Sequence, residues 1–567
     1  MASASPLLHT SLAESYSSRL RRFAELSAGV LRNFHAELPQ ITERWGIDPT
    51  RVLERLAAED EGALDRRLLR AFGLFRDRHT LPSLDDRAEV YRLPFALCSV
   101  EEAGVQRVLV ETREPAEVPG WVSPGVEVTH WNGEPIVEAA LRCGDQQRAR
   151  HGAARLALGL VGLTRRTTGS VPKPRSEWVT LTGICDGSGG VREARFHWRA
   201  SGLAALSRSD AHFSPACAAA VEAAEPLGSP DCSTLEIEGA SVAVLRLREL
   251  AGEEAVRALD DLLRREPEAL LVDLRGNAGG EIEIADRLVH RLVGGSPAPC
   301  RFQFRRTDAV RRMLRRHSAW KDWSEPESDG WFVARPVTSR QRLESRGSGY
   351  TGRVVVLVDA LTYSAAEILA GRLREKAGAV LVGLDGATGG GLANAWGYSA
   401  LASLHPTLQL ELSGAERRRD GQGAVARDWH LARWAADLRL ERAAGYSEAD
   451  SGLWLLRRED GSEIAVEWAP ERDDLRLAVF DRANPLLPEL PVGLGLQLSV
   501  RRALVRGTKE SSGGALVPDV RLRRRRLDVV RGDADLYRRC LRSPRLQRVA
   551  APRHQRPPSG DQAGEMR

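Results

Sequence analysis

Lysine is scarce in this chain of 567 residues. Its scarcity limits both the class of partner and the kind of catalytic base that we expect. Of the 82 basic residues only Lys173, Lys321, Lys376 and Lys509 are lysines, and the net charge is only +5. The arginines are spread along the whole chain, whereas a nucleic-acid-binding domain gathers its basic residues on one face. The densest run, residues 521–526, is typical of a solvated edge strand. We therefore expect no nucleic-acid partner.

Paired cysteines, long apolar runs and metal motifs are missing as well. The seven cysteines are scattered without a C-x-x-C pair, which argues against a disulfide framework or a zinc site and favours a reducing compartment. No stretch reaches the roughly 18 apolar residues of a membrane span. The first residues lack the basic start and apolar run of a signal peptide. We expect no metal, no cofactor and no membrane span, and a cytoplasmic location for the chain as written.

The stretch 353–391 is where the sequence is most informative. Val354–Val358 is a continuous β-branched and apolar run that predicts a buried strand. From Ser364 onward apolar residues recur at helical spacing. Ser364 would therefore lie at a helix tip beyond the carboxyl end of a strand, where free N–H groups favour negative charge. This is a suitable place for an acyl-transfer nucleophile, although Ser364 and Glu367 also form a Ser-x-x-Glu capping box that needs no catalysis.

A second stretch, residues 268–280, has the same design. A buried strand over Ala269–Leu274 ends in a glycine-rich turn, and a helix follows. Glycine lets backbone N–H groups approach a ligand closely. The N–H of Gly279 or Gly280, together with the N–H of Ala365, could therefore form an oxyanion hole.

The order of these motifs resembles the C-terminal processing (tail-specific) serine peptidase family, including its tricorn-like and retinoid-binding-protein-like branch. The motifs that carry the resemblance are DRHT at 77–80, DLRGNAGG at 273–280, SAAE at 364–367, TGGG at 388–391 and GALVPDV at 514–520.

The resemblance implies roles for further residues. In the bacterial branch of this family the base is a lysine in a Gly-Lys-Gly context, but here the segment reads TGGG. Lys376 lies twelve residues after Ser364, about 18 Å along a helix, and cannot reach the hydroxyl, which argues against a Ser–Lys dyad. In the tricorn-like branch the base is a histidine, which implies that His79 activates Ser364 and that a distant glutamate, for which Glu510 is the candidate, orients the site. Arg78 departs from that pattern, which has a helper serine at this position.

The patterns and the resemblance together predict an α/β fold with a ClpP/crotonase-like core of βαβ units. An N-terminal helical region, a PDZ-like β module and an inserted β-rich segment would accompany the core. The expected divisions are a helical region carrying the base (1–88), the PDZ-like module (89–170), a β-rich connector (171–233), the peptidase core (234–395 and 491–545), an insertion with a β-hairpin at 453–468 (396–490), and a disordered tail (546–567).

The function expected from this reading is that of a serine endopeptidase, a tail-specific hydrolase acting on polypeptide tails. A non-catalytic protein that binds peptides or apolar ligands on the same core is the main alternative. A crotonase-type acyl-CoA enzyme is a third reading, since that fold also offers two backbone donors. The sequence leaves open whether the chain forms a homo-oligomer. Because many relatives are exported, a different N-terminus would place the protein outside the cytoplasm.

Overall fold

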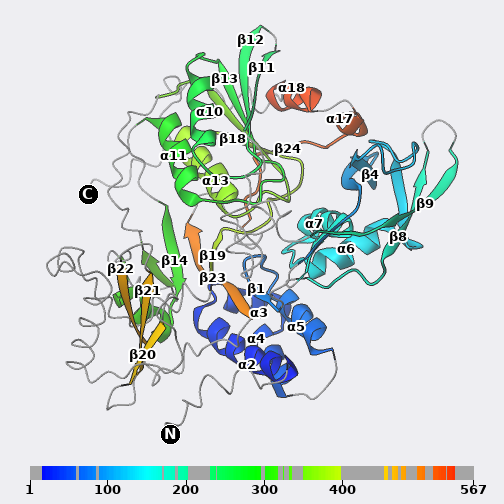
Figure 1. The fold of residues 1–567 in the computed structure, drawn as a ribbon. Coiled ribbons are helices and arrows are strands. Elements are labelled where there is room, and N and C mark those ends of the chain that lie inside the picture. Colours follow the sequence, from blue (N-terminus) through cyan, green and yellow to red (C-terminus); the bar gives the residue numbers. More distant parts are fainter. Residues whose placement is uncertain are drawn as a thin grey trace, which may run out of the picture.

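A computed structural model gives the fold of the chain (Figure 1). It describes residues 16–58, 63–84, 89–168, 171–185, 189–201, 230–237, 239–294, 300–316, 323–324, 331–334, 349–397, 453–457, 463–469, 474–480, 494–504, 515–530 and 533–542. The candidate residue Glu510 and the predicted tail 546–567 lie outside these ranges, as does most of the predicted insertion.

A six-stranded sheet forms the centre of the fold. Its strands, in spatial order, are β11 (Asp231–Ile237), β12 (Ala240–Arg246), β13 (Ala269–Asp273), β17 (Arg353–Val358), β18 (Val380–Gly383) and β24 (Val520–Arg521). The edge strand β11 is antiparallel, and all other neighbours pair parallel. Every residue of β13 and β18 is buried, as expected of parallel strands covered on both faces. The predicted α/β core is confirmed at this level.

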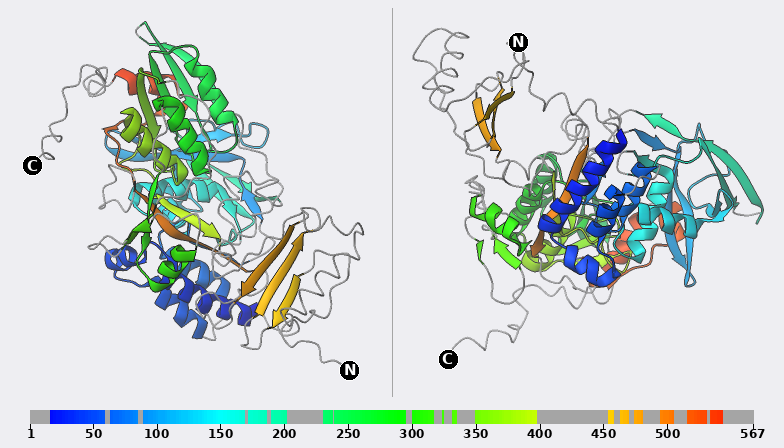
Figure 2. Two further views of the ribbon diagram at one scale, coloured as in Figure 1. Left: turned by 90° about the vertical axis from the view of Figure 1, so that its left-hand side faces the viewer. Right: turned by 90° about the horizontal axis from the view of Figure 1, so that it is seen from below.

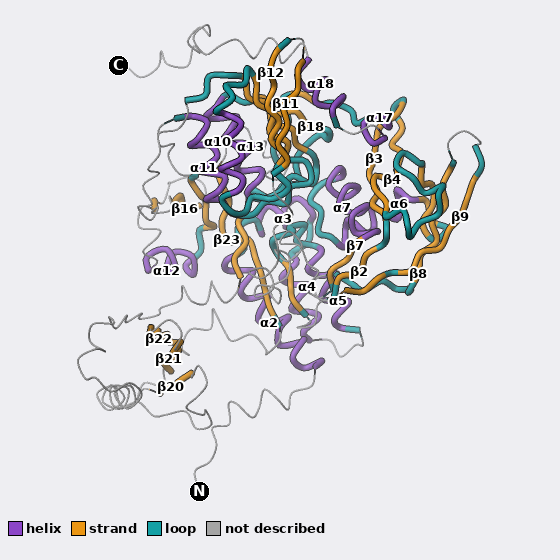
Figure 3. Tube along the Cα trace, turned by 45° about the horizontal axis from the view of Figure 1, so that its top comes forward, coloured by secondary structure: helices purple, strands orange, loops and turns teal. Residues whose placement is uncertain are grey.

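Helices cover both faces of this sheet. Helices α10 (Glu254–Leu263), α11 (Ile282–Val293) and α13 (Ala365–Ala377) lie on one face, and α18 (Ala534–Arg542) lies on the other (Figure 1). Alternate residues of the strands point to the two sides, so that Val356 packs with the first group and Val355 with α18. The loops at one end of the sheet gather toward the N-terminal helices (Figure 3).

A second, antiparallel sheet joins distant parts of the chain. It contains β1 (Leu81–Ser83), β14 (Arg301–Arg305), β15 (Trp323–Ser324), β16 (Trp331–Ala334), β19 (Ala393–Gly397) and β23 (Gly495–Leu504), and helix α12 (Asp308–Arg316) follows β14. Strand β23 pairs with β1, β14 and β19. Since β1 begins two residues after His79 and β19 begins two residues after Gly391, this sheet brings the DRHT and TGGG segments together.

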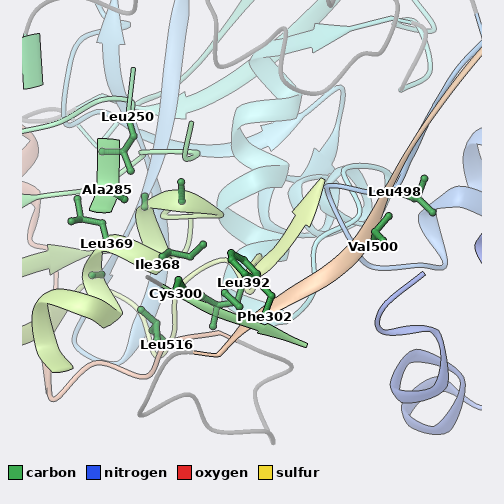
Figure 4. Close-up of a cluster of buried hydrophobic side chains, with 14 of the residues drawn as sticks. Leu250, Ala285, Cys300, Phe302, Ile368, Leu369, Leu392, Leu498, Val500 and Leu516 are labelled. Atoms are coloured by element: carbon green, nitrogen blue, oxygen red, sulfur yellow. The ribbon is translucent and has the colours of Figure 1, made fainter. Parts of the chain in front are cut away.

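The N-terminal helices pack onto the same core. They are α2 (Tyr16–Phe34), α3 (Leu38–Trp45), α4 (Pro49–Ala58) and α5 (Leu64–Gly73), and α2 lies alongside β23 (Figure 2). Their apolar faces and those of α10, α11 and α13 belong to one continuous cluster. Figure 4 shows part of this cluster, to which Ile368 and Leu369 of α13 and Phe302 of β14 all belong. The helix that carries the nucleophile candidate and the sheet that carries the base candidate therefore share one core.

A separate module occupies residues 90–201. Its main sheet has the order β3 (Phe95–Glu102), β4 (Val105–Arg113), β5 (Glu127–Trp131), β8 (Trp178–Ile184) and β9 (Val191–His197), with β6 (Glu134–Pro135) beside β5. Helices α6 (Ile136–Gln146) and α7 (Gly152–Thr164) pack against it, and β2 (Val90–Arg92), β7 (Arg165–Thr167) and β10 (Arg199–Ser201) form a small sheet. An Asn132-Gly133 turn joins β5 to β6, with both residues at positive φ. Strands β8 and β9, which belong to the expected connector, are part of the module's own sheet.

A C-terminal arm, residues 520–530, fastens this module to the core. The arm leaves the central sheet at β24 and ends in α17 (Arg526–Val530), which contacts β4 (Figure 1). Its arginines form ion pairs with glutamates of the module: Arg521 and Arg523 with Glu101, Arg524 with Glu111, and Arg526 with Glu102 and Glu127. The arginine run expected to be a solvated edge strand is therefore largely an interdomain contact.

The described part of the predicted insertion is a three-stranded antiparallel sheet. It contains β20 (Leu453–Arg457), β21 (Glu463–Ala469) and β22 (Asp474–Phe480). The hairpin predicted within 453–468 is confirmed by the pairing of β20 with β21. Within the described residues, no helix combines the length and the apolar character that crossing a membrane requires.

Candidate active site

Ser364 lies in the turn between β17 and α13, with an unusual backbone. Its φ is +57° and its ψ is −126°, a conformation that costs a non-glycine residue roughly 1–3 kcal/mol. A serine in a strained strand-to-helix turn presents its hydroxyl outward, as nucleophiles in such turns do. Ser364 is partly exposed, although most residues around it are buried.

The glycine-rich turn after β13 lies directly against the Ser364 turn. The Tyr363 N–H donates to the Asn277 carbonyl at 2.9 Å, and the Thr362 hydroxyl donates to the Leu274 carbonyl, also at 2.9 Å. A Cβ added to Gly279 would lie 2.7 Å from the Ser364 Cβ, so only glycine allows this approach. The two turns meet because β13 and β17 are adjacent parallel strands whose carboxyl ends share one edge of the sheet.

His79 reaches this turn from the other side. Its Nε2 lies 2.9 Å from the Ser364 Oγ, and its ring contacts the ring of Tyr363 in a tilted arrangement, with 4.7 Å between the ring centroids. The segment that carries His79 is fixed by α5 before it and β1 after it, and the Ser499 N–H of β23 donates to the Thr80 hydroxyl at 3.3 Å. In the tautomer with its proton on Nδ1, the His79 Nε2 can accept the proton of the serine hydroxyl.

Asp77 is the buried anion behind His79. Its carboxylate accepts hydrogen bonds from the His79 N–H (3.0 Å), the Thr80 hydroxyl (2.6 Å) and the Tyr363 hydroxyl (3.2 Å), and the His35 Nε2 lies 3.3 Å away. Burial alone would raise the pKa of Asp77, but the His35 interaction and the positive charges of His79, His35 and Arg150 lower it well below its usual value. The distance from its Oδ1 to the His79 Nδ1 is 3.9 Å, which exceeds a hydrogen bond. Asp77 therefore holds His79 chiefly through the His79 backbone N–H and through its own charge.

Three backbone N–H groups were predicted as oxyanion donors, and they differ in their surroundings. The Gly279 N–H already donates to the Asn277 Oδ1 at 2.8 Å. Among the described residues, the N–H groups of Gly280 and Ala365 have no acceptor. In this conformation Ala365 and Gly280 are therefore the better candidates, and Gly279 serves the close approach of the two turns.

The TGGG turn is held against Ser364 by Glu367. The Glu367 Oε2 accepts the N–H of Ser364 (3.2 Å) and that of Gly391, while its Oε1 accepts the N–H of Gly390 (3.0 Å) and the Thr388 hydroxyl. Glu367 is fully buried, and burial raises its pKa to about 7, although these four hydrogen bonds offset part of the rise. The predicted capping box is present, with the Ser364 side chain at the Glu367 N–H and the Glu367 side chain at the Ser364 N–H, and the Ser364 hydroxyl also lies near His79.

The same turn leaves no room for a side chain at Gly390. Gly390 has a φ of +86°, and a Cβ there would lie 2.7 Å from the Arg150 Cδ. Arg150 is itself buried in an ion pair with Glu37 and donates to the Gly390 carbonyl at 2.8 Å. A lysine at the middle of the Gly-x-Gly segment would thus collide with Arg150. Lys376, near the far end of α13, pairs with Glu375 instead.

Sequence reasoning missed several members of this site. Tyr363 and His35 were not singled out, and Glu367 was noted only as a helix cap. The buried character of Glu367 could have been suspected from its place between apolar residues of α13, but the contacts of Tyr363 and His35 join segments far apart in the chain. Among the described residues, no group of three or more histidine, cysteine, aspartate or glutamate side chains could hold a metal ion.

Residues 241–404 match the family model described as peptidase family S41. That span contains the glycine-rich turn, Ser364 and the TGGG turn, but not His79. Among curated proteins, none matches the chain.

Several solved structures have a similar fold. Mature CPAF superposes with a TM-score of 0.54 at 13% identity, covering 92% of this chain and 96% of CPAF. A CPAF mutant gives a TM-score of 0.55 at 13% identity, with 94% and 97% covered, and mature CPAF complexed with lactacystin gives 0.52 at 14% identity, with 94% and 98% covered. At such low identity the likeness establishes the fold alone, and it extends over nearly the whole of both chains.

Proposed function

We propose, because residues 241–404 match the family model described as peptidase family S41, that the chain is a serine endopeptidase in which Ser364 is the nucleophile and His79 the general base. The observation that carries this proposal is the distance of 2.9 Å between the His79 Nε2 and the Ser364 Oγ. A serine hydroxyl is a weak nucleophile until a base at hydrogen-bond distance accepts its proton.

The proposed reaction is acyl transfer in two stages. In the first, Ser364 Oγ attacks the scissile carbonyl carbon while His79 Nε2 takes the hydroxyl proton. The N–H groups of Ala365 and Gly280 stabilise the oxyanion, and His79 then donates the proton to the leaving amine as the C–N bond breaks. In the second stage, water attacks the resulting ester with His79 again as base. The acid product leaves and the serine hydroxyl is restored.

Asp77 is the described carboxylate best placed to assist His79. Its negative charge lies close to the imidazolium that forms in each stage, and its hydrogen bond to the His79 N–H holds that residue in place. We propose it for the role that the family resemblance suggested for Glu510. Polypeptides are the proposed substrates, and the motif resemblance extends the proposal to polypeptide tails.

A fluorophosphonate probe, which reacts covalently with activated serines, tests the proposal. Wild-type protein and the control Ser176→Ala, which alters an exposed serine of the 90–201 module, should both be labelled. Ser364→Ala should not be labelled, and His79→Gln should react at least about 10²-fold more slowly, the lower end of the usual contribution of general base catalysis. If folded wild-type protein is not labelled, or if Ser364→Ala is labelled equally, the enzyme proposal is wrong and a ligand-binding protein becomes the better reading.

A further inference from the structure

Glu367 connects two segments that are separate in the chain. It belongs to the first turn of α13, and its carboxylate lies between the Ser364 turn and the TGGG turn. Two N–H groups donate to its Oε2, one from Ser364 and one from Gly391. An N–H group of Gly390 and the hydroxyl of Thr388 donate to its Oε1.

These contacts define what Glu367 can do. An ionised carboxylate offers about four acceptor positions and no donor, and here four donors occupy them. In its ionised form Glu367 therefore has no proton to give to a substrate in this arrangement. A glutamate of an ordinary capping box accepts one bond, from the N–H at the start of its own helix, whereas three of the four donors to Glu367 come from the TGGG turn.

The backbone of Ser364 needs such support. A positive φ at a non-glycine residue persists only where the surrounding structure fixes it, and the Ser364 N–H is tied to Glu367. The TGGG turn is fixed in turn by its neighbours: the Leu516 N–H donates to the Thr388 hydroxyl at 2.8 Å, and His151 and Arg150 contact the carbonyls of Thr388 and Gly390.

From this geometry we infer that Glu367 is a positioning residue, which holds the strained Ser364 backbone, and with it the hydroxyl, in line with His79 by tying it to the TGGG turn. The inference rests on the proposed function and adds a residue to it. Because a misplacement of about 1 Å can cost roughly 10²-fold in rate, the effect should appear in the reactivity of Ser364 rather than in probe binding.

The test measures the inactivation of each variant by a fluorophosphonate at a series of probe concentrations, which separates the maximal inactivation rate from the half-saturating concentration. Glu367→Gln replaces one acceptor oxygen with an NH₂ group that faces N–H donors. We expect its maximal rate to fall about 10²-fold, with the half-saturating concentration nearly unchanged. Asp286→Asn is the matched control, because Asp286 is a largely buried carboxylate that pairs with Arg372 of the same helix α13, and it should react like wild type.

Thr388 provides a second, independent pair of variants. Thr388→Ser keeps the hydroxyl that donates to Glu367 and should behave like wild type, whereas Thr388→Val removes it and should slow inactivation about tenfold, as the loss of one charge-assisted hydrogen bond of about 1.5 kcal/mol implies. Circular dichroism and urea unfolding show whether each variant is folded.

The outcomes separate this inference from the proposed function. If wild-type protein does not react, the proposed function itself is wrong. If wild-type protein reacts and Glu367→Gln has the same maximal rate, only the role of Glu367 is wrong. Should Glu367→Gln fail to fold, equal rates for Thr388→Val and Thr388→Ser would overturn the inference.

Discussion

The hydroxyl of Tyr363 donates a hydrogen bond of 3.2 Å to the Oδ1 of Asp77, and so joins the residue before Ser364 to the residue two places before His79. This bond runs beside the 2.9 Å contact between the His79 Nε2 and the Ser364 Oγ. Burial and the charge of Asp77 raise the pKa of Tyr363 well above its usual value, so the hydroxyl remains a donor. The two segments of the proposed active site are thus braced by a pair of residues that take no part in proton transfer.

Removing the hydrogen bond between Tyr363 and Asp77 should slow the reaction of Ser364 markedly and lower the stability of the fold only slightly. Tyr363→Phe keeps the ring that contacts His79, but it leaves an oxygen of Asp77 with one donor fewer and removes the acceptor of the Arg78 N–H. We expect a stability loss of about 1–2 kcal/mol, as for two hydrogen bonds, and a several-fold decrease in the maximal rate of fluorophosphonate inactivation. Urea unfolding and inactivation kinetics provide the two measurements.

Tyr350→Phe is the control for the Tyr363 variant. Its hydroxyl donates to the Pro267 carbonyl at 2.9 Å, away from the site. Its loss should affect stability similarly and leave the inactivation rate unchanged. Equal rates for both variants would mean that the Tyr363 bond does not align the site.

Asp77 should make stability depend on pH in a defined direction. Its folded-state pKa lies well below the usual value, so its contribution to stability is present above the unfolded-state pKa of about 3.9 and is lost as the pH falls through the folded-state pKa. We expect Asp77→Asn to be less stable than wild type near neutral pH, and the difference to shrink below about pH 4. Urea unfolding from acid to neutral pH measures this.

An exposed carboxylate serves as the reference for that series. Asp308→Asn, whose side chain is 79% exposed, should show a small difference from wild type across the whole range. If the stability gap between Asp77→Asn and wild type stays constant on acidification, Asp77 is not held ionised in the folded protein.

Much of this site follows from local sequence patterns, and the remainder depends on contacts that local patterns do not contain. The apolar run at 354–358 and the helical spacing after Ser364 predicted the turn, and β17 ends at Val358 while α13 begins at Ala365. Periodicity reports burial of neighbouring residues and therefore finds strands and helices. It could not indicate that Tyr363 meets Asp77, which lies 286 positions earlier.

The same limit applies to the module and the arm. Strands β8 and β9 lie in the segment predicted to be a β-rich connector, and nothing in their own residues reveals that β8 pairs with β5 as well as with β9. The arginine run at 521–526 has the composition of an exposed segment. Its glutamate partners lie about 400 positions earlier in the chain, so its role as an interdomain contact could not be read from composition.

The TGGG turn should tolerate no side chain at Gly391. A Cβ there would lie 2.2 Å from the Tyr363 Cζ, and the fully buried Tyr363 ring has no room to retreat. Gly391→Ala should therefore cost about 1–3 kcal/mol, as overpacking does, and should slow inactivation because Tyr363 adjoins Ser364.

Gly386→Ala is a control from the same loop. Gly386 is exposed, and an added Cβ would have nothing within 4 Å, so the change should stay within about 0.5 kcal/mol. Urea unfolding of the two variants gives the comparison. Equal stabilities would show that the turn can move away from Tyr363.

Ion pairs of the C-terminal arm should hold the 90–201 module in place. Arg524 pairs with Glu111 at 2.7 Å, and its side chain is only 19% exposed. Arg524→Glu would place two like charges together in a largely buried contact, and removing one partner of a buried pair costs about 3–5 kcal/mol. We expect faster limited proteolysis between the module and the core, together with lower stability.

The charge-swapped double variant, Arg524→Glu with Glu111→Arg, decides whether the pair itself is responsible. It should recover part of the loss, with a coupling energy of about 0.5–3 kcal/mol in a double-mutant cycle. Arg264 and Asp261, an exposed pair within one helical stretch, provide the reference, because such pairs contribute only about 0.3–0.5 kcal/mol.

A cycle on Arg524 and Glu111 with no coupling would mean that apolar contacts fasten the arm instead. One such contact is that of Val529 with Cys98, Val100 and Leu109. If apolar contacts fasten the arm, added salt should leave the proteolysis rate unchanged. If ion pairs fasten it, added salt should increase the proteolysis rate, because salt screens the more exposed pair of Arg523 with Glu101.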